Sequence, residues 1–152
     1  FQVVRVTTAQ EMYEAMHQRR EGADYIICSA AVSDFRPKVT VNKKIKKDQG
    51  VPTIELVENP DILSSLGQVK AEDQILIGFA LETENEKEYA RKKLEAKNLN
   101  AVVMNTLRDS GAGFGHDTNK VYVYTRDEQW TEFDLNSKEV IAQNLWKLFK
   151  TL

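Results

Sequence analysis

A short run of small and polar residues is the first candidate for a ligand site. Residues 29–37 read SAAVSDFRP and begin inside the continuous apolar run at 23–31, which is typical of a strand buried on both faces. Small side chains let a flat ligand approach the backbone, and Ser33 and Asp34 would offer a donor and an acceptor at the carboxyl edge of that strand. The alternative is a strand-to-loop turn with a solvated or capping Asp34, and the spacing alone favours neither.

Two groups of lysines could bring positive charge to an anionic ligand. Residues 43–47 read KKIKK, which is either a solvated face, the commoner case, or a mobile arm that delivers an ammonium to a polyphosphate. Lys93 and Lys97 are four positions apart and therefore share one face of a predicted helix at 84–97. They would hold phosphates or, as is commoner, pair with acidic residues nearby: Glu86, Glu88 or Glu95.

The Asn59-Pro60 pair predicts the start of a helix, with Asn59 as the N-cap and Pro60 at the first helical position. A helix N-terminus presents free N–H groups and the positive end of the helix dipole, and both suit an anion. Asp61 in the first turn already satisfies part of that dipole. Since every helix has such an end, this feature alone indicates no ligand.

Several other chemistries are disfavoured. Cys28 lies inside the apolar run with no histidine beside it, so we interpret it as an unreactive core thiol. A single cysteine excludes an internal disulfide, and the two histidines, His17 and His116, lack metal-ligand spacing. Neither the G-x-G-x-x-G pattern nor the G-x-x-x-x-G-K-[ST] pattern occurs, which argues against a nicotinamide-dependent oxidoreductase and a P-loop protein.

The elements that position these residues alternate along the chain. Apolar runs predict strands at 3–6, 23–31, 53–57, 74–80 and 101–104, and a hairpin at 120–125 and 130–135. Helices are predicted from Thr8, which opens a capping box, from Asn59, over 84–97 and from Ser137, with loops at 32–50 and 109–119. This order predicts an α/β fold with a Rossmann-like, doubly wound, mostly parallel sheet, helices on both faces, a C-terminal β-hairpin and a protruding charged flap. Ligands bind such sheets at the carboxyl ends of the strands, here near 33–38, 79–83 and 105–115.

The composition is that of an ordinary globular domain. The chain has 152 residues, of which 41% are hydrophobic and 29% charged. Its 21 basic and 23 acidic residues give a net charge of −2, which argues against a nucleic-acid binder or a polybasic membrane binder. No run approaches the roughly 18 apolar residues of a membrane span and no signal peptide is recognisable, so we expect a cytoplasmic protein.

The order of the motifs is more specific than any one of them. It resembles phosphopantothenoylcysteine synthetase, the synthetase half of the bacterial bifunctional coenzyme A biosynthesis protein, over nearly the whole chain: SAAVSDFRP, KKIKK, ELVENPDIL, IGFALETEN, ARKKLEAKNLNAVVMN and GFGHDTNKV. The resemblance implies that CTP activates the carboxylate of 4′-phosphopantothenate as an acyl-cytidylate with loss of pyrophosphate. The amine of L-cysteine then displaces CMP. It further implies that Mg²⁺ accompanies the triphosphate and that the domain forms a homodimer.

The resemblance also implies roles for residues at matching positions. The nucleotide site would be lined by the end of the second strand, a helix start, the following strand and two lysines: Cys28, Ser29, Ala30, Asp34, Pro60, Asp61, Ile62, Leu63, Phe79, Lys93 and Lys97. Lys44 opens the K-I-K-K motif and matches a flap lysine associated with turnover, so it is the predicted catalytic residue and a nucleotide contact. Residues 36–57 match the flap and dimerisation region. The resemblance assigns no metal ligand.

The chain departs from the family pattern at its start. The family begins with a glycine-rich nucleotide-fold segment, followed by an Asn- and Ser-containing loop that holds the acyl-cytidylate, and neither occurs in residues 1–152. The FMN-dependent decarboxylase half of the bifunctional protein does not occur either. We therefore expect these residues to bind CTP without completing the reaction alone. The alternative function is a CTP-binding and dimerisation module.

Overall fold

The central element is a five-stranded sheet in the order β1-β4-β5-β6-β7. The computed structural model describes residues 1–41, 43–46, 51–81, 85–105 and 115–152. Strands β1, β4 and β5 run parallel, whereas β6 and β7 add an antiparallel hairpin. The bounds are Tyr25–Cys28 for β1, Ile75–Leu81 for β4, Ala101–Asn105 for β5, Thr118–Thr125 for β6 and Trp130–Ser137 for β7. The predicted α/β fold with a C-terminal hairpin is confirmed.

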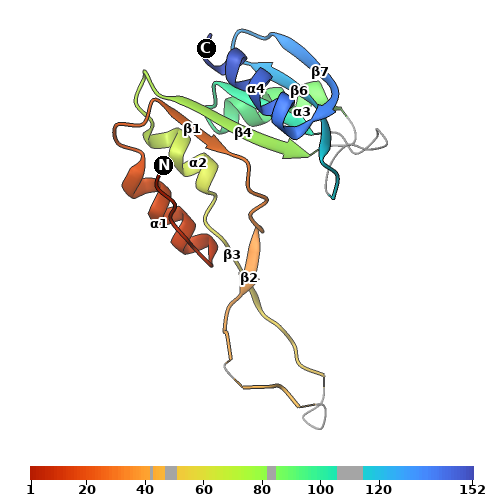
Figure 1. Ribbon diagram of the computed structural model, residues 1–152. Coiled ribbons are helices and arrows are strands. Elements are labelled where there is room, and N and C mark those ends of the chain that lie inside the picture. The colour runs from red at the N-terminus through yellow and green to blue at the C-terminus, as the bar shows by residue number, and fades with distance from the viewer. Residues whose placement is uncertain (42, 47–50, 82–84, 106–114) are drawn as a thin grey trace.

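Helices cover both faces of this sheet (Figure 1). Helices α1 (Ala9–Arg19), α2 (Ile62–Val69) and α3 (Glu86–Ala96) pack on one face, and α4 (Lys138–Phe149) packs on the other. Strand β5 shows why helices are needed on both faces of the sheet. Val102 and Met104 belong to the apolar cluster on the face covered by α1, α2 and α3, whereas Ala101 and Val103 belong to the cluster on the face covered by α4. Burial on both faces explains its uninterrupted apolar sequence.

The helix starts follow from their capping residues. The Thr8 hydroxyl accepts a hydrogen bond from the Glu11 N–H at 3.1 Å, and the Glu11 carboxylate accepts one from the Thr8 N–H at 3.1 Å. This reciprocal pair confirms the capping box predicted for α1. Ser137 caps α4 by accepting from the Val140 N–H at 3.3 Å. None of the helices in the described part of the chain has the length and apolar character of a membrane span.

A two-stranded antiparallel ribbon connects the flap to the rest of the domain. Strand β2 (Phe35–Pro37) pairs with β3 (Leu56–Glu58), and the Lys38 N–H continues the ladder by donating to the Glu55 carbonyl at 2.9 Å. The Lys38 ammonium also pairs with the Glu55 carboxylate at 2.7 Å. Beyond this ribbon the described flap residues project away from the sheet (Figure 1) and are exposed.

The strand predicted at 3–6 is wrong, and the strand predicted at 23–31 exists but is shorter and less buried than expected. Residues 3–6 form no strand, and Val3 and Val6 are 67% and 40% exposed. A β-branched run becomes a strand only where another strand pairs with it, and residues 1–7 have no such partner among those described. The run at 23–31 gives only the short β1, and β1 is not buried on both faces because Ile27 is 42% exposed. Ile27 is exposed because β1 lies at the edge of the sheet.

Two element boundaries also differ from the prediction. The strand expected at 53–57 is β3, which starts later and pairs with the flap rather than with the main sheet. The helix expected at Asn59 begins at Ile62, because the N-cap is Asp61 and not Asn59. Residues 109–114 of the predicted loop, Lys47, Thr83 and Glu84 lie outside the described residues.

Candidate functional site

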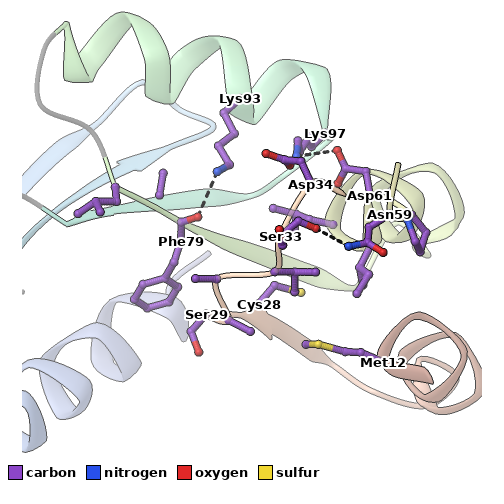
Figure 2. A pocket seen from close by; sticks show the side chains of 18 of the residues that line it. Met12, Cys28, Ser29, Ser33, Asp34, Asn59, Asp61, Phe79, Lys93 and Lys97 are labelled. Atoms are coloured by element: carbon purple, nitrogen blue, oxygen red, sulfur yellow. Dashed lines mark hydrogen bonds and ion pairs between the residues drawn. The ribbon is translucent and has the colours of Figure 1, made fainter. Parts of the chain in front are cut away.

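One pocket of about 390 Å³ lies at the carboxyl ends of the three parallel strands (Figure 2). Cys28, Phe79 and Asn105 bring the ends of β1, β4 and β5 to its wall. Eleven of the twelve predicted nucleotide-binding residues line it: Cys28, Ser29, Ala30, Asp34, Pro60, Asp61, Ile62, Leu63, Phe79, Lys93 and Lys97. The rule that open parallel sheets bind ligands at this edge thus located the pocket. The nucleotide-binding role of these residues stays a prediction.

The twelfth residue, Lys44, does not reach the pocket. It is exposed on the projecting flap and is absent from the pocket lining. A lysine in an exposed, charged segment has no apolar surface to hold it against the body, so a sequence motif cannot fix its distance from the site.

The N-terminus of α2 forms one wall. The Asp61 carboxylate accepts a hydrogen bond from the Ser64 N–H at 2.9 Å and pairs with the Lys97 ammonium at 2.8 Å. Burial raises the pKa of Asp61, but the Lys97 and Ser64 hydrogen bonds and the charges of Lys97 and Lys93 outweigh it, so the pKa is lowered. This carboxylate therefore stabilises the fold above pH 3.8, its ordinary pKa, and the contribution is lost as the pH falls through the lowered value.

Helix α3 forms a second, cationic wall. The Lys93 ammonium donates to the carbonyl of Phe79 at 3.1 Å, and Lys97 reaches Asp61 from the next turn (Figure 2). Two acidic residues of this helix pair with other cations, since Glu88 binds Lys92 at 2.6 Å and Glu95 lies 4.0 Å from Arg91. The i, i+4 spacing thus places both predicted lysines on the face that borders the pocket.

The loop after β1 closes the third side and is tied to α2 by Asn59. The Asn59 N–H donates to the Asp34 carbonyl at 2.8 Å, and its amide Nδ2 donates to the Ser33 carbonyl at 2.8 Å. Sequence reasoning interpreted Asn59 as a helix cap and missed this role. Met12 of α1 also lines the pocket. Only the tertiary packing of α1 brings it there, so the sequence held no signal for it.

Cys28 is a weak nucleophile at neutral pH. Burial raises the pKa of its thiol from 9.0 to about 11, because the thiolate is poorly solvated among apolar groups. Two pKa units correspond to roughly a hundredfold less thiolate at neutral pH. Because the unfolded chain keeps the ordinary thiol pKa of 9.0, the fold loses stability as the pH rises from 9 toward 11.

We predict that iodoacetamide alkylates Cys28 about a hundredfold more slowly at pH 7.5 in the native chain than in 8 M urea. Cys28 is the only cysteine, so mass spectrometry of the intact chain follows a single product. Equal rates in the native and unfolded chains would show that the thiol is solvated and ionises normally.

The described residues include no group of three histidine, cysteine, aspartate or glutamate side chains arranged to hold a metal ion. Mg²⁺ in nucleotide sites is usually held by one or two carboxylates together with the phosphates of the substrate. Asp34 and Asp61 are the carboxylates of the pocket lining, and Asp61 already pairs with Lys97. The donor set therefore fits a cation brought in with a polyphosphate, with Asp34 as the available carboxylate.

Taken together, these observations define a Rossmann-like α/β domain with a pocket at the carboxyl edge of its sheet. The chain belongs to the family described as DNA/pantothenate metabolism flavoprotein C-terminal domain, whose sequence model matches residues 1–152.

The chain is also similar to individual proteins. The chain is 45% identical over 135 residues to the coenzyme A biosynthesis bifunctional protein CoaBC of Bacillus subtilis, covering 89% of this chain and 33% of that protein. It is 41% identical over 150 residues to a cysteine/cysteine sulfinic acid decarboxylase from an unidentified prokaryote, covering 99% of this chain and 42% of that protein. The crystal structure of the C-terminal domain of a CoaBC protein is 40% identical, with a TM-score of 0.76, covering 97% of this chain and 66% of that one. The chain thus spans less than half of these two curated relatives.

Proposed function

We propose that this domain binds CTP and serves in the CTP-dependent joining of 4′-phosphopantothenate to L-cysteine, a step of coenzyme A biosynthesis in the cytoplasm. The observation that supports the proposal best is the convergence of Lys93, Lys97 and the N-terminus of α2 on one pocket at the carboxyl edge of the sheet. Two ammonium groups and a helix N-terminus suit the phosphates of a nucleotide. A volume of about 390 Å³ is within the usual range for small-molecule sites.

The chemistry explains why the site needs fixed cations. A carboxylate oxygen of 4′-phosphopantothenate attacks the α-phosphorus of CTP, and the bond to pyrophosphate breaks. The amine nitrogen of L-cysteine then attacks the acyl carbon, CMP leaves and the amine loses a proton. Negative charge builds up on the departing pyrophosphate, and ammonium groups held beside it stabilise that charge. Mg²⁺ bound to the triphosphate would screen the same oxygens.

The parts of the pocket suit different parts of the nucleotide. The small side chains of Ser29 and Ala30 leave the backbone after β1 open to a flat base, and Phe79 offers an aromatic ring from β4. Lys93, Lys97 and the first N–H groups of α2 would meet the phosphates. Asp34 would bind the ribose, the base or the cation that accompanies the triphosphate.

The flap at 36–57 has two proposed roles. Lys44 would assist turnover by approaching the phosphates after a movement of the flap, since it lies outside the pocket in this structure. The described flap region and its ribbon also expose several large apolar side chains: Phe35, Val39, Val41, Ile45, Ile54 and Leu56. Exposed apolar groups on a projecting arm suit an interface between two copies of the domain. We propose that the domain forms a homodimer through this region.

A second candidate function is a nucleotide-binding and dimerisation module that does not complete the reaction. The position of Lys44 away from the pocket favours it. The names of the two curated relatives differ, one being a decarboxylase and the other a bifunctional coenzyme A biosynthesis protein. The pocket and the motif resemblance, rather than either name, support CTP-dependent joining of 4′-phosphopantothenate to L-cysteine.

Calorimetric titration with CTP and with NADH tests the proposal. We expect CTP to bind in the presence of Mg²⁺ and NADH not to bind. Release of pyrophosphate on adding 4′-phosphopantothenate, followed by cysteine-dependent release of CMP, would establish the complete activity. Binding of CTP without either release would identify the second candidate. Absence of CTP binding would refute both.

A further inference from the structure

Asn59 makes three hydrogen bonds that connect separate segments around the pocket. Its N–H donates to the Asp34 carbonyl and its Nδ2 to the Ser33 carbonyl, each at 2.8 Å. Its Oδ1 accepts from the Arg36 guanidinium at 3.0 Å. Figure 2 shows Asn59 reaching from the segment before α2 to Ser33, a residue 26 positions earlier in the chain.

The chemistry of these partners fixes the orientation of the Asn59 amide. A guanidinium can only donate and a carbonyl can only accept, so turning the amide over would lose both side-chain hydrogen bonds. Arg36 is itself held, because the same NH1 group donates to the Glu58 carbonyl at 2.5 Å and the residue pairs with Val57 in the β2–β3 ribbon. Arg36 at the base of the flap and the Ser33 carbonyl together determine which way the amide of Asn59 points.

We infer that Asn59 is a positioning residue for the ligand pocket. It holds the loop at 29–34 against the start of α2. These two segments are walls of the pocket, so Asn59 fixes the width of the space between them that the ligand must fill. A wall that is already ordered lowers the cost of binding, since the ligand does not have to order the loop itself. The inference deepens the proposed function and rests on it, because the ligand is taken to be CTP.

The Asn59→Ala variant tests the inference with two readouts. It removes both side-chain hydrogen bonds and adds no charge that would repel a triphosphate. We expect the dissociation constant for CTP to rise about five- to tenfold, the effect of losing one or two such bonds. We expect iodoacetamide to alkylate Cys28 about fivefold faster at pH 9, because the loop that follows Cys28 is released from α2.

Two further variants complete the experiment. Arg36→Lys retains the positive charge but cannot reproduce the planar guanidinium, so it should shift both readouts in the same direction by a smaller factor. It lies on an exposed strand outside the core, which keeps the test valid if Asn59→Ala fails to fold. Asn136→Ala is the matched control, since Asn136 lies on β7 and its Oδ1 accepts only from the neighbouring Ser137 N–H at 2.9 Å among the bonds described. It should leave both readouts unchanged.

Unchanged CTP affinity and unchanged Cys28 alkylation in folded Asn59→Ala and Arg36→Lys variants would overturn the inference. A loss of affinity with no change in alkylation would overturn it as well, because Asn59 would then act by touching the nucleotide and not through the loop. If the wild-type chain does not bind CTP, the proposed function fails. The alkylation rates still decide whether Asn59 holds the loop.

Discussion

Replacing Gly67 with alanine should lower the free energy of unfolding by about 3 kcal/mol. In an ordinary helix the same substitution raises stability by up to about 1 kcal/mol. Gly67 differs because α2 lies directly against the end of α3 there, and a Cβ atom would sit 1.9 Å from the Lys97 carbonyl oxygen. That neighbour is backbone and cannot rotate away, so the two helices must separate.

The same separation would disturb the pocket. The Asn98 amide donates to the Gly67 carbonyl at 2.7 Å, and the Lys97 ammonium reaches Asp61 at 2.8 Å across the junction of the two helices. Moving α2 away from α3 stretches both contacts. We therefore expect the affinity for CTP to fall together with the stability.

Urea unfolding followed by circular dichroism measures the first effect, and the melting temperature should drop by about 6–12 °C for a domain of this size. Gln68→Ala is the matched control, since Gln68 is exposed on the same helix and its replacement should change the stability by less than about 0.5 kcal/mol. A stabilised Gly67→Ala variant would mean that α2 and α3 are not in contact at this point.

Local chemistry made much of the fold predictable from the sequence. The reciprocal Thr8–Glu11 cap needs only residues three positions apart, and it starts α1 as expected. The uninterrupted apolar run of β5 indicates a sheet covered on both faces. Because parallel strands end at one edge, the sequence alone assigns the residues at the ends of β1 and β4 to a common pocket.

The features that the sequence did not reveal depend on contacts between distant segments. The run at 3–6 has strand chemistry but no strand to pair with. Asn59 looks like a helix cap, yet its partners are Ser33, Asp34 and Arg36, which nothing in the local pattern connects to it. A glycine inside a helix ordinarily weakens it, and only the packing of α3 shows why a side chain cannot fit at Gly67.

Lys97→Ala should weaken CTP binding more than Lys93→Ala does. Each substitution removes one ammonium from the pocket, which costs about 1–3 kcal/mol for a charge-assisted contact. Lys97 has a second effect, because its ammonium neutralises the Asp61 carboxylate at 2.8 Å in the structure. Without Lys97, that carboxylate is an unpaired negative charge at the helix end that would receive the phosphates. Water screens the partly exposed carboxylate, so the extra loss is about 1 kcal/mol.

A double-variant comparison separates these two effects. Asp61→Asn removes the charge but keeps a residue that caps helices well, so α2 should stay folded. Adding it to Lys97→Ala should recover about fivefold in CTP affinity, whereas adding it to Lys93→Ala should recover little, because Lys97 remains to balance Asp61. Calorimetric titration at two salt concentrations measures the four affinities, and the recovery should shrink at the higher concentration. Equal recovery in both backgrounds would show that the Asp61–Lys97 ion pair does not set the charge of the pocket.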